Sequence, residues 1–430
     1  MTYLNQICWS IATVLLVGCG IYYSFKLNFI QFNFKEMIKS FKDRAKSKES
    51  VSPFETLTLA LAARIGVGSL AGIAIGIYSG GIGVIFWIWL STIFTLPNTF
   101  VESLLAVIYR KKDGDYYKGG PAYYISAGLG YKKLALIYAI VISVCYLGGF
   151  LAIQSNTISA SISGFTNVPN YVTGIIVSLV SFFIIFKGLK SITKFTSKLV
   201  PVMGIGYLLI CLAVILMNIN LIPSLIINIV KNAFNFKAFG FGILSSMIIG
   251  IQRGIFSSES GIGTGACASG TSDTNYPVKQ GLIQMIGVYF TTFVVCTSTA
   301  IIILTSNVDI NNFINANGIE IVQSALSYHL GDIANIILLI IIITFAFSTV
   351  VSGYYYGESN IKYIFKNISE KGVLILKIIV VLIILYGAIA SSSKLWNLVD
   401  IGVAILAIIN VLAIFMLRKD VFIEMKSRRK

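Results

Sequence analysis

The sequence predicts an all-α polytopic membrane protein with about 11 transmembrane helices. Of its 430 residues, 56% are hydrophobic and only 12% are charged, whereas soluble domains carry about 25% charged residues. The mean hydropathy is +0.86, and the apolar residues form runs near the length of about 20 residues that a helix needs to cross a bilayer. Two of these runs are interrupted by polar, glycine-containing segments. We therefore expect a bundle of membrane helices, two of them discontinuous, with the lipid bilayer as partner.

The distribution of charge and the positions of the cysteines argue against several other classes of protein. The net charge is +16, but the basic residues lie in short loops between apolar runs, which is typical of membrane topology and does not indicate nucleic-acid binding. The six cysteines stand singly and there is one histidine, His329, in a predicted loop. This pattern favours small buried hydrophobic cysteines and gives no disulfide, no metal cluster and no cofactor.

Eleven spans follow from the apolar runs. They are residues 5–25, 54–79, 83–109, 132–162, 170–187, 199–218, 239–271, 278–305, 333–358, 372–391 and 396–417. The first run has no basic segment before it and lysines after it, so we interpret it as a retained span with its N-terminus outside, and not as a cleaved signal peptide.

The distribution of lysine and arginine agrees with this orientation. With the N-terminus outside, 27 of the 33 basic residues fall in cytoplasmic loops and the C-terminal tail, and only Lys231, Lys237 and Lys394 fall outside. Cytoplasmic loops of membrane proteins carry an excess of basic residues. We therefore expect a multi-pass plasma-membrane protein with a cytoplasmic C-terminus and an oligomeric state that the sequence leaves unknown.

The spans divide into two equal sets if the first one is peripheral. The predicted parts are a peripheral N-terminal helix with a basic loop, a first five-helix repeat, an extracellular interfacial segment, a second five-helix repeat and a basic tail, at residues 1–50, 51–218, 219–238, 239–417 and 418–430. Each interrupted run then opens one repeat. Because five is odd, the second repeat must start from the opposite membrane face, as an inverted repeat requires.

Two outside connections are long. Residues 219–238 show apolar positions at helical spacing, which predicts an interfacial helix. Residues 306–332 are acidic without lysine or arginine, and we interpret them as a solvated loop.

The first interrupted run, residues 53–83, carries Arg64 and then the sequence G-V-G-S at 66–69. An arginine near the middle of a bilayer costs between about 3 and more than 10 kcal/mol, so it must face protein or water. Each glycine weakens a helix by about 1 kcal/mol relative to alanine. The second run, 239–271, contains G-I-F-S-S-E-S-G-I-G at 254–263. Where such helices open, freed main-chain groups need partners, which an ion or a polar solute can supply.

Seven motifs of the sequence resemble those of a known family. The motifs are A-L-A-A-R-I-G-V-G-S-L-A-G (60–72), G-G-I-G-V-I-F-W-I-W (80–89), E-S-L-L-A-V-I-Y-R (102–110), K-G-G-P-A-Y-Y-I (118–125), G-I-Q-R-G-I-F-S-S-E-S-G-I-G (250–263), Y-P-V-K-Q-G-L (276–282) and F-A-F-S-T-V-V-S-G-Y-Y-Y-G-E (345–358). They resemble the sodium:alanine symporter family. The resemblance implies a leucine-transporter type of fold and sodium-coupled import of alanine, glycine or another small neutral amino acid. Val67, Ser69 and Ser258 depart from the usual G-T-G-N and F-S-N-E patterns.

The resemblance also implies a substrate site at the two breaks. The amides of Val67, Gly68 and Ser69 suit the carboxylate of an amino acid, and the carbonyls near Gly254, Ile255 and Phe256 suit its ammonium group. The alternative is that the glycines only permit close helix packing. The full set of expected substrate contacts is Gly66, Val67, Gly68, Ser69, Gln154, Gly254, Phe256, Ser257 and Ser258.

For sodium, the resemblance implies a second set of residues. The hydroxyls of Ser348 and Thr349 and the carbonyls of Ala62, Ile65 and Phe345 form the expected site. The alternative is that both hydroxyls bond only to carbonyls of their own helix.

The charges at membrane depth are interpreted as a gate or as structural ion pairs. They are Arg64, Arg253, Glu102 and Glu259, and a pair between Arg253 and Glu259 is the expected arrangement. The sequence has no G-x-x-x-x-G-K-S/T motif and no catalytic Cys/His or Ser/His pair at membrane depth. We therefore expect a transporter and no enzyme. The alternatives are proton coupling or a membrane sensor that does not transport.

Overall fold

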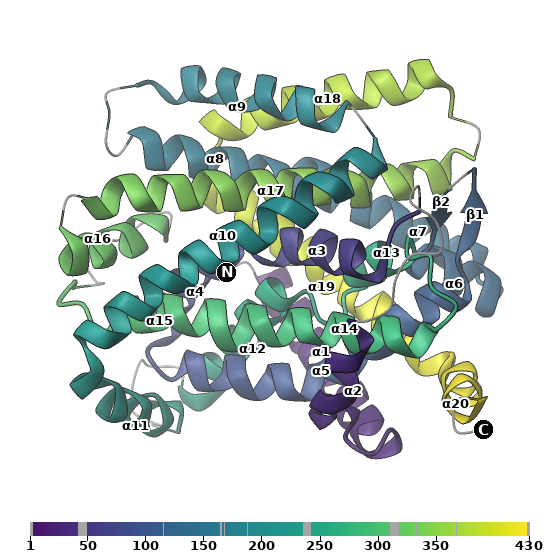
Figure 1. Ribbon diagram of the computed structural model, residues 1–430, viewed down its shortest axis with the longest axis horizontal. Helices are drawn as coiled ribbons and strands as arrows, with labels where there is room; N and C mark the ends of the chain where they lie inside the picture. The colour runs from purple at the N-terminus through teal and green to yellow at the C-terminus, as the bar shows by residue number, and fades with distance from the viewer. Residues whose placement is uncertain are drawn as a thin grey trace.

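The computed structural model describes residues 3–41, 50–114, 116–163, 166, 168–186, 188–234, 242–309, 318–331, 333–366 and 368–427. In these residues the chain is almost wholly helical, and long helices run side by side along the longest axis of the molecule (Figure 1). The predicted all-α membrane fold is therefore confirmed.

The first half of the chain holds one interrupted helix and one hairpin. Its elements are α1 (Tyr3–Lys26), the 3-10 helix η1 (Ile30–Phe32), α2 (Phe34–Ser40), α3 (Pro53–Arg64), α4 (Val67–Gly80), α5 (Val84–Ile108), β1 (Lys111–Asp113), β2 (Tyr116–Lys118), α6 (Pro121–Gly128), α7 (Lys132–Ser143), the π-helix η2 (Val144–Phe150), α8 (Leu151–Ser163), α9 (Asn170–Ile185), α10 (Leu189–Met217), the 3-10 helix η3 (Ile219–Leu221) and α11 (Ile222–Ala233). The strands β1 and β2 pair antiparallel.

The second half begins with the other interrupted helix. Its elements are α12 (Gly242–Ser258), α13 (Thr264–Ser269), α14 (Pro277–Tyr289), the π-helix η4 (Phe290–Cys296), α15 (Thr297–Leu304), α16 (Ile319–Leu330), α17 (Ile333–Ile364), α18 (Glu370–Ile389), α19 (Ser392–Met416) and α20 (Arg418–Ser427). In the centre, α5 packs against α12 and α14, while α17 packs against α3, α7 and α8.

Helices lie at all eleven predicted spans. Among the described residues, nine helical segments are long and apolar enough to cross a membrane. The two remaining spans correspond to α9, which has 16 residues, and to the interrupted pair α12 and α13. That these two also cross the bilayer stays a prediction.

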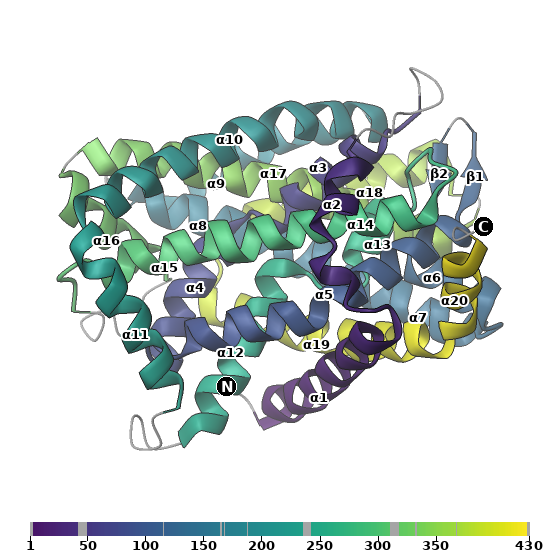
Figure 2. The same ribbon diagram turned by 60° about the horizontal axis from the view of Figure 1, so that its bottom comes forward.

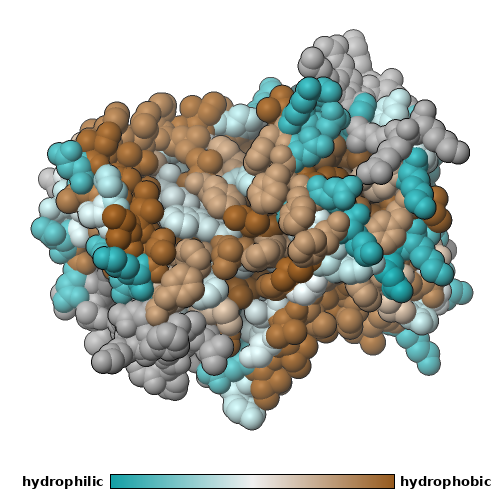
Figure 3. All heavy atoms as spheres, turned by 90° about the horizontal axis from the view of Figure 1, so that it is seen from below, coloured by the Kyte–Doolittle hydropathy of each residue, from teal (hydrophilic) through white to brown (hydrophobic). Residues whose placement is uncertain are grey.

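The two ends of the bundle carry different segments. The hairpin, α6 and α20 lie at one end, whereas α11 and α16 lie at the other (Figure 1). The first group comes from loops predicted to be cytoplasmic and the second from loops predicted to be outside. On the face drawn in Figure 3, apolar side chains fill the middle and hydrophilic side chains gather toward the ends, as expected for a protein that crosses a bilayer.

Helix α1 lies on the outside of the bundle (Figure 2), against α5 and α19. One face is buried through Trp9, whose Nε1 donates to the Asp400 carbonyl at 3.0 Å, and through Gly20. A Cβ on Gly20 would lie 1.7 Å from the Phe94 carbonyl oxygen, so only glycine permits this approach. The opposite face exposes apolar side chains such as Val14, which is 72% exposed and suited to contact lipid.

The long connections contain helices. The segment expected at 219–238 holds α11, as predicted, while residues 235–241 lie outside the described residues. The connection at 306–332 is not a plain loop, because α16 packs there on α4, α15 and α17; residues 310–317 and 332 lie outside the described residues. His329, expected in a loop, is therefore in a helix and buried.

His329 joins three elements. Its Nε2 donates to the Ile302 carbonyl at 3.1 Å, and its Nδ1 accepts from the Asn218 side-chain amide at 3.3 Å. That amide also donates to the Val214 carbonyl, which fixes its orientation. Burial lowers the pKa of His329 below its ordinary 6.5. The folded protein therefore favours the neutral imidazole of His329.

This geometry predicts a pH dependence of stability. Because the folded-state pKa is depressed, the contribution of His329 is fully present above about pH 6.5 and is lost as the pH falls below it. We expect the melting temperature of the purified protein to fall more between about pH 7.5 and 5.5 than that of a His329→Gln variant. If the melting temperatures of the two proteins fall equally over this pH range, His329 does not cause the pH dependence.

Candidate functional site

The first helix break lies between α3 and α4. Helix α3 starts with a capping box, in which Ser52 and Glu55 bond each other's main chain, and Pro53 fills the first helical position. The helix ends because Ile65 (φ −87°, ψ 73°) and Gly66 (φ −128°, ψ −160°) leave the helical region. At Gly66 the chain restarts as α4 without a side-chain cap. The first amides of a helix have no partner within it, so this break presents donors.

The hydroxyls of α17 lie against this break. Ser348 Oγ and Thr349 Oγ1 each lie 3.0 Å from the Ala62 carbonyl, and each also contacts the Phe345 carbonyl, at 2.8 and 3.1 Å. A Cβ on Gly66 would lie 2.2 Å from Thr349 Oγ1, so glycine is required for this approach. The structure thus brings together four of the five residues expected to bind sodium. The fifth, Ile65, is buried in the break itself.

The second break lies between α12 and α13, where the main chain is fixed by side chains from other helices. Glu259 (φ 52°), Gly261 (φ 82°) and Gly263 (φ 91°) adopt positive φ. The Gly263 amide donates to Glu102 Oε2 at 3.0 Å, and the Asn410 amide donates to the same oxygen at 2.8 Å and to the Gly261 carbonyl at 2.9 Å.

Further partners complete the second break. Tyr138 donates to the Ile262 carbonyl at 2.7 Å. The Glu259 carboxylate accepts from Tyr146 at 2.5 Å and from Thr264 at 3.0 Å. Tyr146 stands on the π-helix η2, and π-helical turns occur frequently at functional sites. The loop of this break is therefore satisfied by protein groups.

The two breaks face each other. Ser257 Oγ donates to the Gly68 carbonyl at 3.1 Å, and a Cβ on Gly68 would lie 2.9 Å from the ring of Phe256. That ring stacks on Phe150 with a centroid distance of 5.1 Å and contacts Trp396, also at 5.1 Å. An aromatic layer therefore covers the start of α4.

Helix α12 continues past Gly254 and Ile255, whose carbonyls the sequence predicts as contacts of the ammonium group. The Ile255 carbonyl accepts from the Glu259 amide at 2.8 Å, so α12 continues to Ser258. Gly254 lies inside this helix, where a Cβ would lie 3.1 Å from Ser91 Oγ and 3.4 Å from the Ile88 Cα of α5. Gly254 thus serves helix packing. The carbonyls of the last turn, from Phe256 to Ser258, are the free acceptors, because a helix leaves its final carbonyls unpaired.

The other side chains predicted to contact the substrate differ in their hydrogen bonding. Gln154 is 2% exposed, and its Oε1 has no hydrogen-bond partner among the described residues. The Ser69 amide, expected to bind the carboxylate, donates instead to the Gly66 carbonyl at 3.2 Å, as Ser69 Oγ does at 2.9 Å. Thr299 donates to the Ser69 carbonyl at 2.9 Å. Ser258 Oγ accepts from the Ser260 amide at 3.3 Å. Of these side chains, Gln154 alone offers a buried acceptor in need of a partner.

The expected pair between Arg253 and Glu259 is wrong. Arg253 Nη2 lies 2.8 Å from Asp400 Oδ2 of α19, and both side chains are about 95% buried. Its guanidinium also lies 5.4 Å from the centroid of the Trp396 ring. Glu259 points instead to Tyr146 and Thr264. A buried cation takes the nearest carboxylate that the fold supplies, and here the helix break turns Glu259 away from Arg253.

Arg64 is buried without a carboxylate within 4 Å among the described residues. Its Nη1 donates to the carbonyl and to Oε1 of Gln284, at 3.3 and 3.2 Å. Gly265 and Gly287 leave room for it, because a Cβ at either position would lie 2.5 or 2.8 Å from the guanidinium. Arg64 thus links α3 to α14 through Gln284, while its Nε and Nη2 are buried without a hydrogen-bond partner among the described residues.

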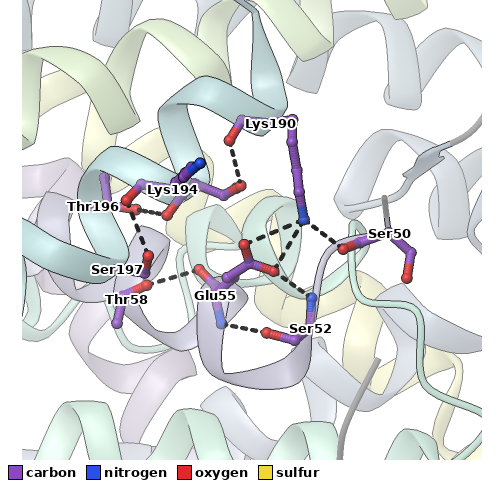
Figure 4. A network of polar contacts seen from close by, with 9 residues as sticks. Ser50, Ser52, Glu55, Thr58, Lys190, Lys194, Thr196 and Ser197 are labelled. Atoms are coloured by element: carbon purple, nitrogen blue, oxygen red, sulfur yellow. Dashed lines mark hydrogen bonds and ion pairs between the residues drawn. The ribbon is translucent and has the colours of Figure 1, made fainter. Parts of the chain in front are cut away.

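The end of α3 away from the break is tied to neighbouring segments. Figure 4 shows Lys190 of α10 reaching to Glu55 and to the Ser50 carbonyl, at 3.3 and 2.7 Å. Val51 pairs with Ser272 beyond α13 in a parallel bridge. The two half-helices α3 and α13 are therefore joined at one end of the site, while Arg253 and Asp400 close the other.

Sequence reasoning missed Asp400, Asn410, Tyr138 and Tyr146. Asp400 is the only acidic residue in the predicted span 396–417, and an ionisable residue at membrane depth is a functional-site signal in its own right. Asn410 follows it in the same apolar run. The tyrosines carry no such signal, since buried tyrosines are common in helical cores.

Comparisons with known proteins agree with this geometry. The sequence model of the sodium:alanine symporter family matches residues 1–430. The chain is 38% identical to the amino-acid carrier protein AlsT of Bacillus subtilis over 96% of its length and 88% of the relative's. It is 40% identical to the probable sodium/glutamine symporter GlnT of the same organism over 98% of its length and 89% of the relative's.

A solved structure shares the fold. The structure of MhsT in complex with L-phenylalanine matches 87% of this chain and 99% of that chain, with a TM-score of 0.58 and 13% sequence identity. This likeness shows that the chain has the leucine-transporter type of fold.

The buried pair of Arg253 and Asp400 makes a prediction about stability. Removing one partner of a buried ion pair costs about 3 to 5 kcal/mol, because the remaining charge is left uncompensated. We expect Asp400→Asn to lower the melting temperature, and the double variant Arg253→Met/Asp400→Leu to recover most of the loss. Glu36→Gln is the control, since it breaks an exposed pair with Lys39 that is worth about 0 to 1 kcal/mol. If Asp400→Asn melts like the control, the pair is not structural.

Proposed function

Because its whole length matches the family model and its relatives are 38% and 40% identical, the chain belongs to the sodium:alanine symporter family, and we propose that it imports alanine, glycine or a similar small neutral amino acid. As a member of this family it is a sodium-coupled membrane transporter and not an enzyme. The observation that carries the proposal is the pair of facing helix breaks, one of which presents open main-chain donors.

The substrate carboxylate binds at the start of α4. The amides of Val67 and Gly68 follow an uncapped helix start, where the helix dipole adds a partial positive charge. Val67 and Ser69 are fully buried, so an anion here exchanges water for fixed donors in a site of low dielectric constant. This arrangement needs no charged side chain, which is consistent with a zwitterionic substrate of zero net charge.

The ammonium group binds at the last turn of α12. The carbonyls from Phe256 to Ser258 end that helix, where the dipole is negative. Gln154 adds an acceptor from α8 through its buried, unpartnered Oε1. A ligand donor at this oxygen would remove the cost of about 1 to 3 kcal/mol for an unsatisfied buried group.

The aromatic layer limits the size of the side chain. Phe256 lies against Gly68, with Phe150 on one side and Trp396 on the other. A methyl group or a hydrogen leaves this layer in place, whereas a longer side chain has to displace a ring that stacks on Phe150 and contacts Trp396. This supports alanine or glycine over the glutamine named for one relative.

Sodium binds between α3 and α17. Hard cations prefer oxygen ligands, and the carbonyls of Ala62 and Phe345 meet the hydroxyls of Ser348 and Thr349 within 3.1 Å. Hydroxyl groups rotate to offer lone pairs when a cation is present. The Ile65 carbonyl completes the set.

Sodium and substrate are coupled through Gly66. This residue touches Thr349 on the sodium side and precedes the amides on the substrate side. A cation held by Ala62 and Thr349 therefore orders the segment that binds the carboxylate. One sodium ion entering across about 100 mV releases about 2.3 kcal/mol, which supports roughly fiftyfold accumulation of a neutral solute at about 1.4 kcal/mol per factor of ten.

Alternating access requires that each end of the site open in turn. On the outer side, the Arg253 and Asp400 pair lies beside Trp396 and forms the gate. On the inner side, Lys190 holds Glu55 and the Ser50 carbonyl, and this latch must release when α3 moves (Figure 4). Arg64 and Glu259 are structural, because their partners lie within the bundle.

The proposed topology places the N-terminus outside and the C-terminus in the cytoplasm of a plasma-membrane protein. Residues 1–50 form the peripheral helix and its loop, 51–218 and 239–417 the two inverted repeats, 219–238 the outer connection and 418–430 the tail. The excess of basic residues at one set of loops supports this orientation.

The sodium site gives the test of the function. We expect uptake of labelled alanine into proteoliposomes to require an inward sodium gradient and to be inhibited by unlabelled glycine more strongly than by glutamine. We expect Thr349→Val to raise the sodium concentration for half-maximal uptake at least about tenfold, because one lost oxygen ligand costs more than about 1.4 kcal/mol.

The control is Thr344→Val on the same helix. In the described part of the chain, the Thr344 hydroxyl bonds only to the Ile340 and Ile341 carbonyls of its own helix. This variant should keep the sodium dependence of the wild type. Uptake driven by a proton gradient without sodium would contradict the sodium proposal, and uptake of no small amino acid would contradict the transport proposal.

A further inference from the structure

A basic pocket lies at one end of the bundle, away from the transport site. It has a volume of about 420 Å³ and lies between the β1–β2 hairpin and the connection from α17 to α18. Among the described residues, its charged lining consists of Lys111, Lys112, Lys118, Lys362, Lys366 and Asp113. The excess of lysine over aspartate in this part of the lining favours an anion.

The positive charge is only partly compensated. Lys118 is paired with Asp113, and Lys362 lies 2.5 Å from Glu358 of its own helix. Among the described residues, Lys111, Lys112 and Lys366 have no carboxylate within 4 Å.

The hairpin register adds to the repulsion. Lys111 stands directly opposite Lys118 across the two strands, and like charges in this arrangement are destabilising. An anion between them would remove this cost.

The pocket is built on fixed elements. The Arg110 guanidinium lies 3.9 Å from the centroid of the Tyr117 ring and donates to the Ser272 carbonyl, which anchors the hairpin to the chain beyond α13. In the pocket, Tyr123 of α6 meets Tyr363 of α17 edge to face, with centroids 5.2 Å apart. The elements that carry the lysines are therefore held in place by contacts within the protein.

The position of the pocket identifies the kind of anion. The hairpin follows the end of α5, Lys362 stands in the last turn of α17, and α18 begins at Glu370. These are ends of helices that are long and apolar enough to cross a membrane, and Figure 1 shows the hairpin at the end of the bundle. A bilayer spanned by these helices would have its headgroups near the pocket.

Apolar surface adjoins the pocket. Ile368 lines it, Phe365 is 58% exposed, and α18 continues from there with Ile375 and Ile379, which are 57% and 47% exposed. The neighbouring surface therefore suits hydrocarbon, and a ligand with a phosphate at one end and acyl chains at the other matches both parts.

We propose that this pocket binds the phosphodiester headgroup of an anionic phospholipid, with the acyl chains lying along α18. Basic pockets between membrane helices on the cytoplasmic side bind such headgroups in other proteins. The volume lies within the range of about 300 to 1,000 Å³ of small-molecule sites. A bound headgroup would connect the hairpin to α17. Neither element forms part of the two helix breaks.

The test uses the full chain in a neutral detergent, which provides no charged bilayer surface. Binding of short-chain phosphatidylglycerol, short-chain phosphatidylcholine and inorganic phosphate is measured by native mass spectrometry and by the shift in melting temperature. We expect phosphatidylglycerol to bind and to stabilise, and the other two probes to bind at least about tenfold more weakly.

The variant Lys111→Gln/Lys112→Gln/Lys366→Gln should bind phosphatidylglycerol about 100-fold more weakly, at about 1 kcal/mol for each lysine. The control Lys35→Gln/Lys419→Gln/Lys426→Gln removes three exposed lysines elsewhere and should bind as the wild type does. Unchanged binding by the first variant, equal loss by the control, or equally tight binding of inorganic phosphate would each overturn the proposal.

Discussion

Main-chain groups that leave a helix at membrane depth must find partners inside the protein, and the structure is organised by how its two breaks meet this requirement. At the break after α12, Glu102, Asn410 and Tyr138 satisfy the loop directly. At the break after α3, the side chains of α17 reach the carbonyls, while the start of α4 has no cap. One break is therefore closed by the protein, and the other begins a helix without a side-chain cap.

In the proposed mechanism, this difference allows a neutral substrate and a cation to share one centre. The residues around Gly66 have carbonyls on one side and amides on the other, so the proposal places the cation and the carboxylate next to each other along one backbone segment. Neither needs a charged side chain. The buried charges are bound by other groups of the bundle, with Arg64 bonded to Gln284 of α14 and Arg253 paired with Asp400 of α19.

Sequence reasoning recovered the fold and the two helix breaks, because both depend on patterns that are local in the chain. Apolar runs, glycines beside an arginine and adjacent hydroxyls can be recognised without knowing which helices touch, and Ser348 and Thr349 do lie against Ala62 as expected. Pairing between distant helices cannot be recognised in this way. Arg253 lies six residues from Glu259 in the sequence but pairs with Asp400, 147 residues away. The helical surroundings of His329 were missed because α16 is short and follows an acidic stretch.

The central claim is that a small amino acid and sodium are held by main-chain groups at the two breaks. The most direct measurement is an experimental structure of the protein in a lipid nanodisc with alanine and sodium bound. The account predicts the alanine carboxylate at hydrogen-bond distance, about 3 Å, from the amides of Val67 and Gly68, with a cation among Ala62, Ser348 and Thr349. Alanine bound elsewhere, or α3 and α4 joined as one unbroken helix, would contradict it.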